Sequence, residues 1–192
     1  DGVEIRRRVT YAPGELALYG ELRADEHLRF LLRGREDEAF GRAKKIAQIL
    51  GLPLGQKVRS FSHGMKRQLI FAAAMAPDVR VRILDEPTEG LDPTKRSEVL
   101  ELMAEDAQDG RTILLSSHHL GEVDAICENL AFLDGGRLVS VENANRVRER
   151  TSQIVRIWWT GGAPKNAVQI ISSLGEEAVS YTHLTLPTKR IV

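Results

Sequence analysis

The sequence has 192 residues, of which 42% are hydrophobic and 28% are charged, as expected for one globular domain or a large part of one. Its 27 basic and 27 acidic side chains give a formal net charge of +0. This balance argues against a nucleic-acid-binding surface, which needs clustered positive charge. A single cysteine excludes an internal disulfide framework, and no apolar run reaches the ~20 residues that span a bilayer.

The first half of the chain is expected to be mainly helical. Residues 3–12 have the character of a strand that enters a loop. Residues 21–50 place apolar side chains at helical spacing with charges between them, and Gly51 fits the end of that helical stretch. Residues 62–76 are predicted to form a loop that opens into another helix.

The second half of the chain alternates strands and helices. Residues 81–84 and 112–117 have the character of buried strands. Between them a helix is predicted to begin at Asp92-Pro93, with aspartate as its cap and proline at its first position. This order predicts a βαβ unit and therefore a parallel sheet. Beyond it we expect a helix, two hairpin strands and a tail strand, at residues 120–127, 130–133, 138–141 and 153–159.

Polar residues follow both predicted buried strands. Asp85 and Glu86 end the first strand, and His118 comes directly after the second. Because ligands bind beyond the carboxyl ends of parallel strands, we expect these three side chains on one rim of the sheet. One carboxylate can hold hydrated Mg²⁺ while the next polarises a water molecule. An exposed acidic turn and a purely structural histidine are the alternative interpretation.

A small hydroxyl and a glycine open the helix predicted within residues 62–76. The segment reads Ser62-His63-Gly64-Met65. Helix N-termini attract anions through free N–H groups and a partial positive charge. Gly64 permits close backbone approach, and Ser62 can donate a hydrogen bond to a phosphate oxygen. A plain helix cap is the alternative for this segment taken alone.

Together and in this order, these segments resemble the ABC-transporter ATPase family over residues 1 to about 150. The family's signature loop, Walker B aspartate, catalytic glutamate, D-loop and switch histidine match Ser62-His63-Gly64-Met65, Asp85, Glu86, residues 89–92 and His118, respectively. His119 is the competing choice for the switch histidine. The Gly-Met-Lys run after the signature serine is similar to the export-type branch of drug- and antibiotic-efflux ATPases.

This resemblance implies an α/β fold, with a partial P-loop NTPase (RecA-like) core, a parallel sheet, a helical subdomain and a small C-terminal extension. The ATPase domain is expected over residues 1–141, with its helical subdomain at about 20–76 and its core at about 77–141. An extension is expected at 142–178. Residues 179–188 resemble a translated transposase adaptor, so we expect the tail at 179–192 to be non-native, with a native disordered tail as the alternative.

The resemblance also implies ATP and Mg²⁺ as cofactors and a role for each site residue. Asp85 would hold Mg²⁺ through water, Glu86 would act as general base, and His118 would contact the γ-phosphate. The residues implied to serve the ATP of a second, head-to-tail ATPase domain, or to couple the two sites, are Ser62, His63, Gly64, Met65 and Asp92.

The partners implied are that second domain and a transmembrane permease, with no nucleic acid. The permease would dock on the helices within residues 21–50 and place the protein at the cytoplasmic face of the membrane, where it would power export. A soluble ABC-type ATPase and a non-catalytic ABC subunit are the alternatives.

The sequence departs from the family's pattern at four points. No Gly-Lys pair occurs, so the family's phosphate-binding loop is not present, and family order would place it before Val9. We therefore expect the sequence to begin inside a longer gene. Gly14 stands where a glutamine is usual beside the cofactors, with Glu15 as a substitute candidate. Arg82 lies in a strand expected to be buried and needs a partner there. His63 replaces the first glycine of the signature.

Overall fold

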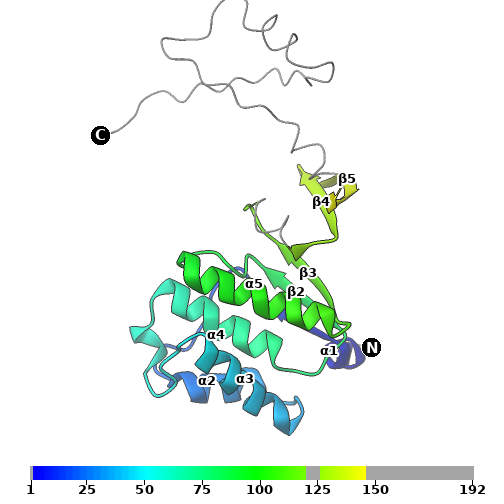
Figure 1. The fold of residues 1–192 in the computed structure, drawn as a ribbon. Helices are drawn as coiled ribbons and strands as arrows, with labels where there is room; N and C mark the ends of the chain where they lie inside the picture. Colours follow the sequence, from blue (N-terminus) through cyan, green and yellow to red (C-terminus); the bar gives the residue numbers. More distant parts are fainter. Residues whose placement is uncertain (1, 120–125, 146–192) are drawn as a thin grey trace, which may run out of the picture. The chain divides into compact units, whose positions relative to one another are not determined.

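The computed structural model describes residues 2–119 and 126–145 of the chain (Figure 1). The chain divides into two compact units, Asp1–Glu128 and Asn129–Val192. The strand expected at 153–159 and the tail at 179–192 lie outside the described residues, as do most of the helix at 120–127 and of the extension at 142–178. The boundaries expected for these segments stay predictions.

Three parallel strands form the sheet of the first unit. They are β1 (Val9–Ala12), β2 (Val81–Asp85) and β3 (Thr112–Ser116), in the order β1-β2-β3. The register pairs Tyr11 with Ile83 and Ile83 with Leu114 across the sheet. The parallel sheet predicted from the strand–helix–strand order is therefore confirmed.

The chain begins with a helix where a strand was expected. Residues 3–12 were predicted as strand, but α1 (Gly2–Arg8) occupies most of that range, and the strand begins only at Val9. The side chain of Glu4 pairs with Arg8 one turn later at 2.8 Å, an arrangement that supports a helix. The basic residues Arg6, Arg7 and Arg8 end the helix, where they complement its dipole.

Helices α2 (Ala24–Leu31), α3 (Asp37–Ile49) and α4 (His63–Met75) lie between β1 and β2 in the sequence, with a short 3₁₀ turn at Val58–Ser60. The helical stretch expected over residues 21–50 is thus two helices. They are separated near Gly34, whose positive φ of 79° glycine adopts without strain. The central helix α4 buries every residue from 67 to 75 and contacts both β1 and β2.

Helix α5 (Pro93–Gln108) connects β2 to β3 and completes the βαβ unit (Figure 1). Asp92 caps it as predicted, because its Oδ1 accepts hydrogen bonds from the backbone N–H groups of Thr94 and Lys95, both at 3.1 Å. Val99 and Met103 are the buried side chains of this helix. Gly110, with φ 86°, closes the turn that leads into β3.

The second unit contains an antiparallel hairpin of β4 (Asn129–Asp134) and β5 (Arg137–Asn143). Its turn is formed by Gly135 and Gly136, which have φ values of 53° and 75°. This is the hairpin predicted from the Asp-Gly-Gly sequence. In the part of the chain that the structure describes, no helix is both long and apolar enough to cross a membrane.

Arg82 is buried in the middle strand, and its guanidinium forms several hydrogen bonds. Its guanidinium donates to both carboxylate oxygens of Asp106, at 2.5 and 3.0 Å. It also donates to the backbone carbonyls of Ala74 and Pro77, at 2.8 and 3.2 Å. The partner that this position requires is therefore supplied by α5, and the arginine is a structural link between strand and helix.

We predict that Asp106→Asn lowers the free energy of unfolding by about 3–5 kcal/mol, because it leaves the buried Arg82 charge without its counter-ion. Chemical denaturation would measure the change. Glu98→Gln is the matched control, since it breaks the more exposed pair with Lys95 and should cost under about 1 kcal/mol. Equal effects of the two substitutions would contradict a special role for the Arg82 pair.

His27 is a buried histidine at the packing surface of α2. Its Nε2 accepts a hydrogen bond from the backbone N–H of Tyr19 at 3.0 Å, and the rings of Tyr19 and Phe30 lie around it. Burial lowers the pKa of His27 below its ordinary value of 6.5. The folded chain therefore holds this imidazole neutral at a pH at which the unfolded chain would protonate it.

We predict that stability falls as the pH is lowered through about 6.5, because the unfolded state then binds a proton that folded His27 does not, and that the loss stops below the lower folded-state pKa. His27→Gln keeps an acceptor near the Nε2 position and should make this pH dependence shallower, by at most about 1.4 kcal/mol per pH unit. Denaturation curves of both proteins between pH 7.5 and 5 would test it, and identical slopes would contradict the assignment.

Candidate functional site

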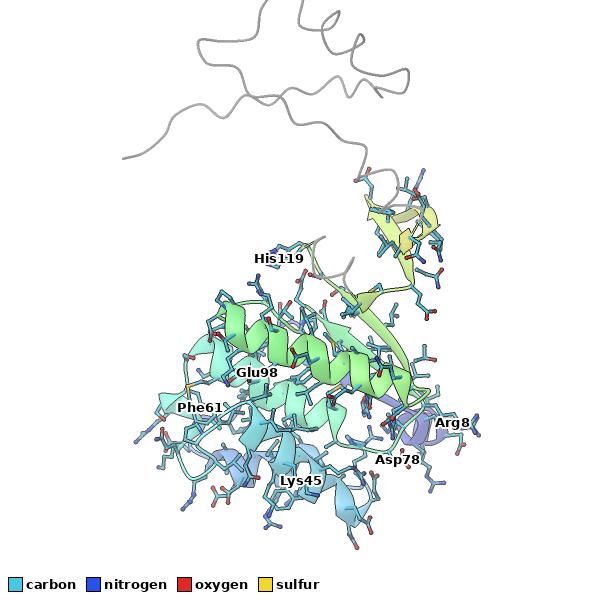
Figure 2. All side chains as sticks on the ribbon, viewed as in Figure 1. Arg8, Lys45, Phe61, Asp78, Glu98 and His119 are labelled. Atoms are coloured by element: carbon cyan, nitrogen blue, oxygen red, sulfur yellow. The ribbon has the colours of Figure 1, made fainter. Side chains whose placement is uncertain are left out.

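The carboxyl ends of β2 and β3 meet at one edge of the sheet. The register pairs Asp85, the last residue of β2, with Ser116, the last residue of β3. Glu86 and His118 follow these positions in the chain, and Figure 2 shows His119 just beyond the end of β3. Asp85, Glu86 and His118 therefore lie at one rim, as the parallel order predicted.

Both oxygens of Asp85 are oriented by neighbouring groups. Oδ1 accepts a hydrogen bond from the Ser116 hydroxyl at 2.5 Å, and Oδ2 accepts one from the backbone N–H of Gly14 at 3.2 Å. No cluster of three or more acidic, histidine or cysteine side chains that could hold a metal exists within residues 2–119 and 126–145. A single oriented carboxylate fits Mg²⁺, which keeps several waters and takes its other ligands from nucleotide phosphates.

Gly14 contacts Asp85 with its backbone. A Cβ atom at this position would lie 2.8 Å from Asp85 Oδ2, closer than real contacts allow. A side chain at residue 14 would therefore displace the carboxylate or the loop. The polar contact of Gly14 is thus its backbone N–H to Asp85, and the neighbouring Glu15 side chain is exposed, so the assignment of either residue to Mg²⁺ or its water stays a prediction.

Glu86 has an unusual backbone conformation for a residue with a side chain. Its φ is 48°, in the left-handed region, which costs of the order of 1–3 kcal/mol. Its backbone N–H donates to both the hydroxyl and the carbonyl of Ser116, at 3.1 and 3.2 Å. Such strain persists only where surrounding contacts hold it, and it is common at functional sites.

The Glu86 side chain points to His118. Its Oε2 is shielded from solvent and lies 3.0 Å from His118 Nδ1. A carboxylate oxygen accepts only, so this contact is attractive when Nδ1 carries a proton. His118 itself is 57% exposed, and its ring contacts that of His119, with centroids 4.0 Å apart and the planes tilted by 42°. The carboxylate and the accessible imidazole can therefore act on the same small reactant.

The predicted anion-binding loop forms the start of α4. The Ser62 hydroxyl accepts a hydrogen bond from the backbone N–H of Met65 at 3.1 Å, which makes Ser62 the helix cap. The first turn packs on the segment after Glu86: a Cβ at Gly64 would lie 2.8 Å from the carbonyl oxygen of Gly90. A Cβ at Gly90 would likewise lie 2.9 Å from the His63 ring.

The predicted site residues thus form two groups. Asp85, Glu86 and His118 gather at the rim with Gly14, whose contact comes from the main chain. The second group lines a cavity of about 320 Å³ where the start of α4 faces the start of α5, and includes Ser62, Gly64, Met65 and Asp92.

Two contributors to the site were not assigned a role from the sequence. Ser116 orients both Asp85 and Glu86, and its signal was the strand register that places it opposite Asp85. Arg67 is 2% exposed and donates to the Gly14 carbonyl at 2.7 Å. The feature of the sequence that could have indicated this role is a charged side chain next to the apolar run of α4.

We predict that Gly64→Ala destabilises the chain by about 1–3 kcal/mol, because the new methyl group would overlap the backbone carbonyl of Gly90. Gly41→Ala is the matched control: Gly41 is also helical, but open space surrounds its Cβ position. Alanine there should raise stability by about 0.5–1 kcal/mol. Thermal or chemical denaturation would measure both, and effects of the same sign would contradict the packing argument.

The chain is similar to proteins of known family. A family model described as "AAA domain, putative AbiEii toxin, Type IV TA system" matches residues 29–124. The linearmycin resistance ATP-binding protein LnrL of Bacillus subtilis (strain 168) is 32% identical over 141 residues, which are 71% of this chain and 45% of LnrL. The phospholipid-transporting ATPase ABCA7 of Homo sapiens is 37% identical over 139 residues, 70% of this chain and 6% of ABCA7. This chain therefore spans less than half of either relative.

Two further similarities extend the match. The ABC transporter ATP-binding protein YtrB of Bacillus subtilis (strain 168) is 28% identical over 191 residues, 96% of this chain and 65% of YtrB. The solved structure of an ATP-binding subunit of an ABC transporter superposes with a TM-score of 0.68 at 32% identity, covering 79% of this chain and 66% of that one.

The dimeric ATP-binding cassette MJ0796 bound to ADP and Pi has the same fold, with a TM-score of 0.64 at 23% identity over 74% of this chain and 66% of that one. The chain belongs to the family of ABC transporter ATP-binding proteins, which have a P-loop NTPase fold.

Proposed function

We propose that this chain is part of an ATP-hydrolysing ABC subunit that powers export of a substrate through a transmembrane partner. The observation that carries the proposal is the Glu86–His118 contact of 3.0 Å beside the oriented carboxylate of Asp85. A general base, a neighbouring imidazole and a carboxylate suited to Mg²⁺ are groups that can serve phosphoryl transfer to water.

In this mechanism Glu86 accepts the proton of the attacking water while that water lies in line with the γ-phosphate. His118 holds the γ-phosphate and keeps the Glu86 side chain in place. Ser116 fixes the backbone of Glu86 and one oxygen of Asp85. Asp85 would hold Mg²⁺, which would supply charge neutralisation for the phosphate oxygens.

The loop at the start of α4 serves a second ATPase domain. We propose a head-to-tail dimer in which Ser62, His63, Gly64 and Met65 face ATP held mainly by the partner, and Asp92 couples the two sites. Support comes from the cavity lined by Ser62, Gly64, Met65 and Asp92, and from MJ0796, whose dimeric structure holds ADP and Pi. Closing and opening of the dimer is a ligand-driven population shift.

The membrane partner is proposed to dock on the α2 and α3 side, which places the protein at the inner face of the cell membrane. Tyr19 and Phe30 support this proposal, because both are large exposed side chains there, at 59% and 39%, and their rings stack edge to face 5.1 Å apart. Export is proposed because LnrL is a resistance protein. Transport of an apolar molecule is consistent with the phospholipid-transporting name of ABCA7.

A non-catalytic ABC subunit and a soluble ABC-type ATPase remain the competing functions. The Glu86–His118 contact weighs against the first, because a binding module needs no general base. We also propose that the 192-residue chain alone binds ATP weakly and hydrolyses it negligibly, since its sequence has no Gly-Lys pair for a phosphate-binding loop.

We predict that Glu86→Gln lowers the rate of ATP hydrolysis by about 10²–10⁴-fold, because the amide cannot accept the proton of water. ATP binding should be retained. The assay is phosphate release and nucleotide binding by a version that carries the phosphate-binding loop, with its permease in vesicles. Glu101→Gln, an exposed change on α5, is the control and should leave both quantities unchanged. Unchanged hydrolysis in Glu86→Gln would favour a non-catalytic subunit, and turnover indifferent to the permease would favour a soluble ATPase.

A further inference from the structure

Arg67 is a buried cation beside the carboxylate rim that the mechanism above does not use. It lies in the second turn of α4, and its side chain is only 2% exposed. Nη1 donates to the carbonyl oxygens of Gly14 at 2.7 Å and of Pro13 at 3.4 Å. Nη2 donates to Glu89 Oε2 at 2.7 Å. One guanidinium therefore joins three segments that are far apart in the sequence.

The first of these contacts leads directly to Asp85. Gly14 accepts from Arg67 with its carbonyl and donates to Asp85 Oδ2 with its N–H, at 3.2 Å. Both polar main-chain groups of Gly14 are thus held, one by the arginine and one by the carboxylate. Ser116 donates to the other oxygen of Asp85, so Arg67 supports, through Gly14, one of the two hydrogen bonds that orient this carboxylate.

The second contact leads to the turn that follows Glu86. The backbone N–H of Glu89 donates to the carbonyl of Glu86 at 3.2 Å, which closes that turn. Arg67 holds the Glu89 side chain, so it fixes the segment after the carboxylate pair as well as the loop in front of it. A charge buried to this extent needs its counter-ion, and loss of either partner leaves the other unpaired.

We propose that Arg67 is a positioning residue that holds Gly14 against Asp85 and the Glu89 turn against α4, and so sets the Asp85 carboxylate for Mg²⁺. The planar guanidinium is suited to this role because it donates along two fixed directions at once. A lysine at this position could satisfy one of the two partners only. The proposal rests on the proposed ATPase function for its purpose, but its geometry can be tested without ATP.

The first test follows the Gly14 amide in the ¹⁵N-labelled 192-residue chain by NMR. Arg67→Met keeps the side-chain length and removes the donors. We expect the Gly14 amide proton to shift upfield and to exchange with solvent roughly tenfold faster, because its hydrogen bond to Asp85 loosens. Glu89→Gln should shift it in the same direction by less, and it is the variant to use if Arg67→Met does not fold.

Arg42→Met is the matched control. Arg42 has the same pattern of partners, since its Nε donates to the Ala76 carbonyl at 2.6 Å and its Nη2 pairs with Glu36, but it does not contact the rim. This variant should leave the Gly14 resonance in place. An unchanged Gly14 amide in both Arg67→Met and Glu89→Gln would overturn the proposal, and so would an equal change in Arg42→Met.

The second test separates positioning from folding in a version with ATPase activity. We expect Arg67→Lys to raise the Mg²⁺ concentration for half-maximal hydrolysis by about tenfold, with the KM for ATP at saturating Mg²⁺ changed by less than about twofold. A merely structural role would lower kcat alone, and that result would overturn the proposal. If the wild type shows no ATPase activity, the proposed function fails, and the Gly14 measurement still decides the role of Arg67.

Discussion

The pairing of Asp85 with Ser116 at the ends of two parallel strands is the constraint on which the rim depends. It places the Ser116 hydroxyl 2.5 Å from one oxygen of Asp85 and within hydrogen-bonding distance of the Glu86 backbone. A shift of one residue between β2 and β3 would turn Ser116 to the other face of the sheet and remove both contacts. The register in turn is held by α5, which connects the strands, and by the burial of Leu84 and Arg82 on the face that the helices cover.

Buried charge has two different uses in this chain. Arg82 joins a strand to α5 through Asp106 and to the end of α4 through two carbonyls, so its role is architectural. Arg67 is equally buried but bonds to segments on either side of the carboxylate pair. Desolvating a guanidinium is costly, and each arginine recovers that cost through a carboxylate and main-chain acceptors. Both arginines contact α4, since Arg67 lies in its second turn and Arg82 bonds to the Ala74 carbonyl near its end.

The sequence was sufficient to predict the parallel sheet from its strand–helix–strand order, and the helix cap at Asp92 from the Asp-Pro pair. The gathering of Asp85, Glu86 and His118 followed, because parallel strands bring their carboxyl ends to one edge. It was insufficient at residues 2–8, where exposed Glu4 and Arg8 pair along a helix and nothing buried marks the element as strand or helix. It also could not assign the contact of Gly14, since a main-chain N–H leaves no signature in a residue's identity. The role of Arg67 depends on a loop 53 residues earlier, a separation that local patterns do not register.

The link between Arg82 and Asp106 has a consequence for how this sequence can change over time. Replacing either residue alone leaves a buried charge, whereas replacing both by apolar side chains of similar volume can restore a packed interior. The route between those two states passes through an unstable intermediate, so the two positions should be inherited together. In descendants of this chain, positions 82 and 106 are therefore expected to vary as a pair. An arginine at position 82 should occur together with an acidic residue at position 106.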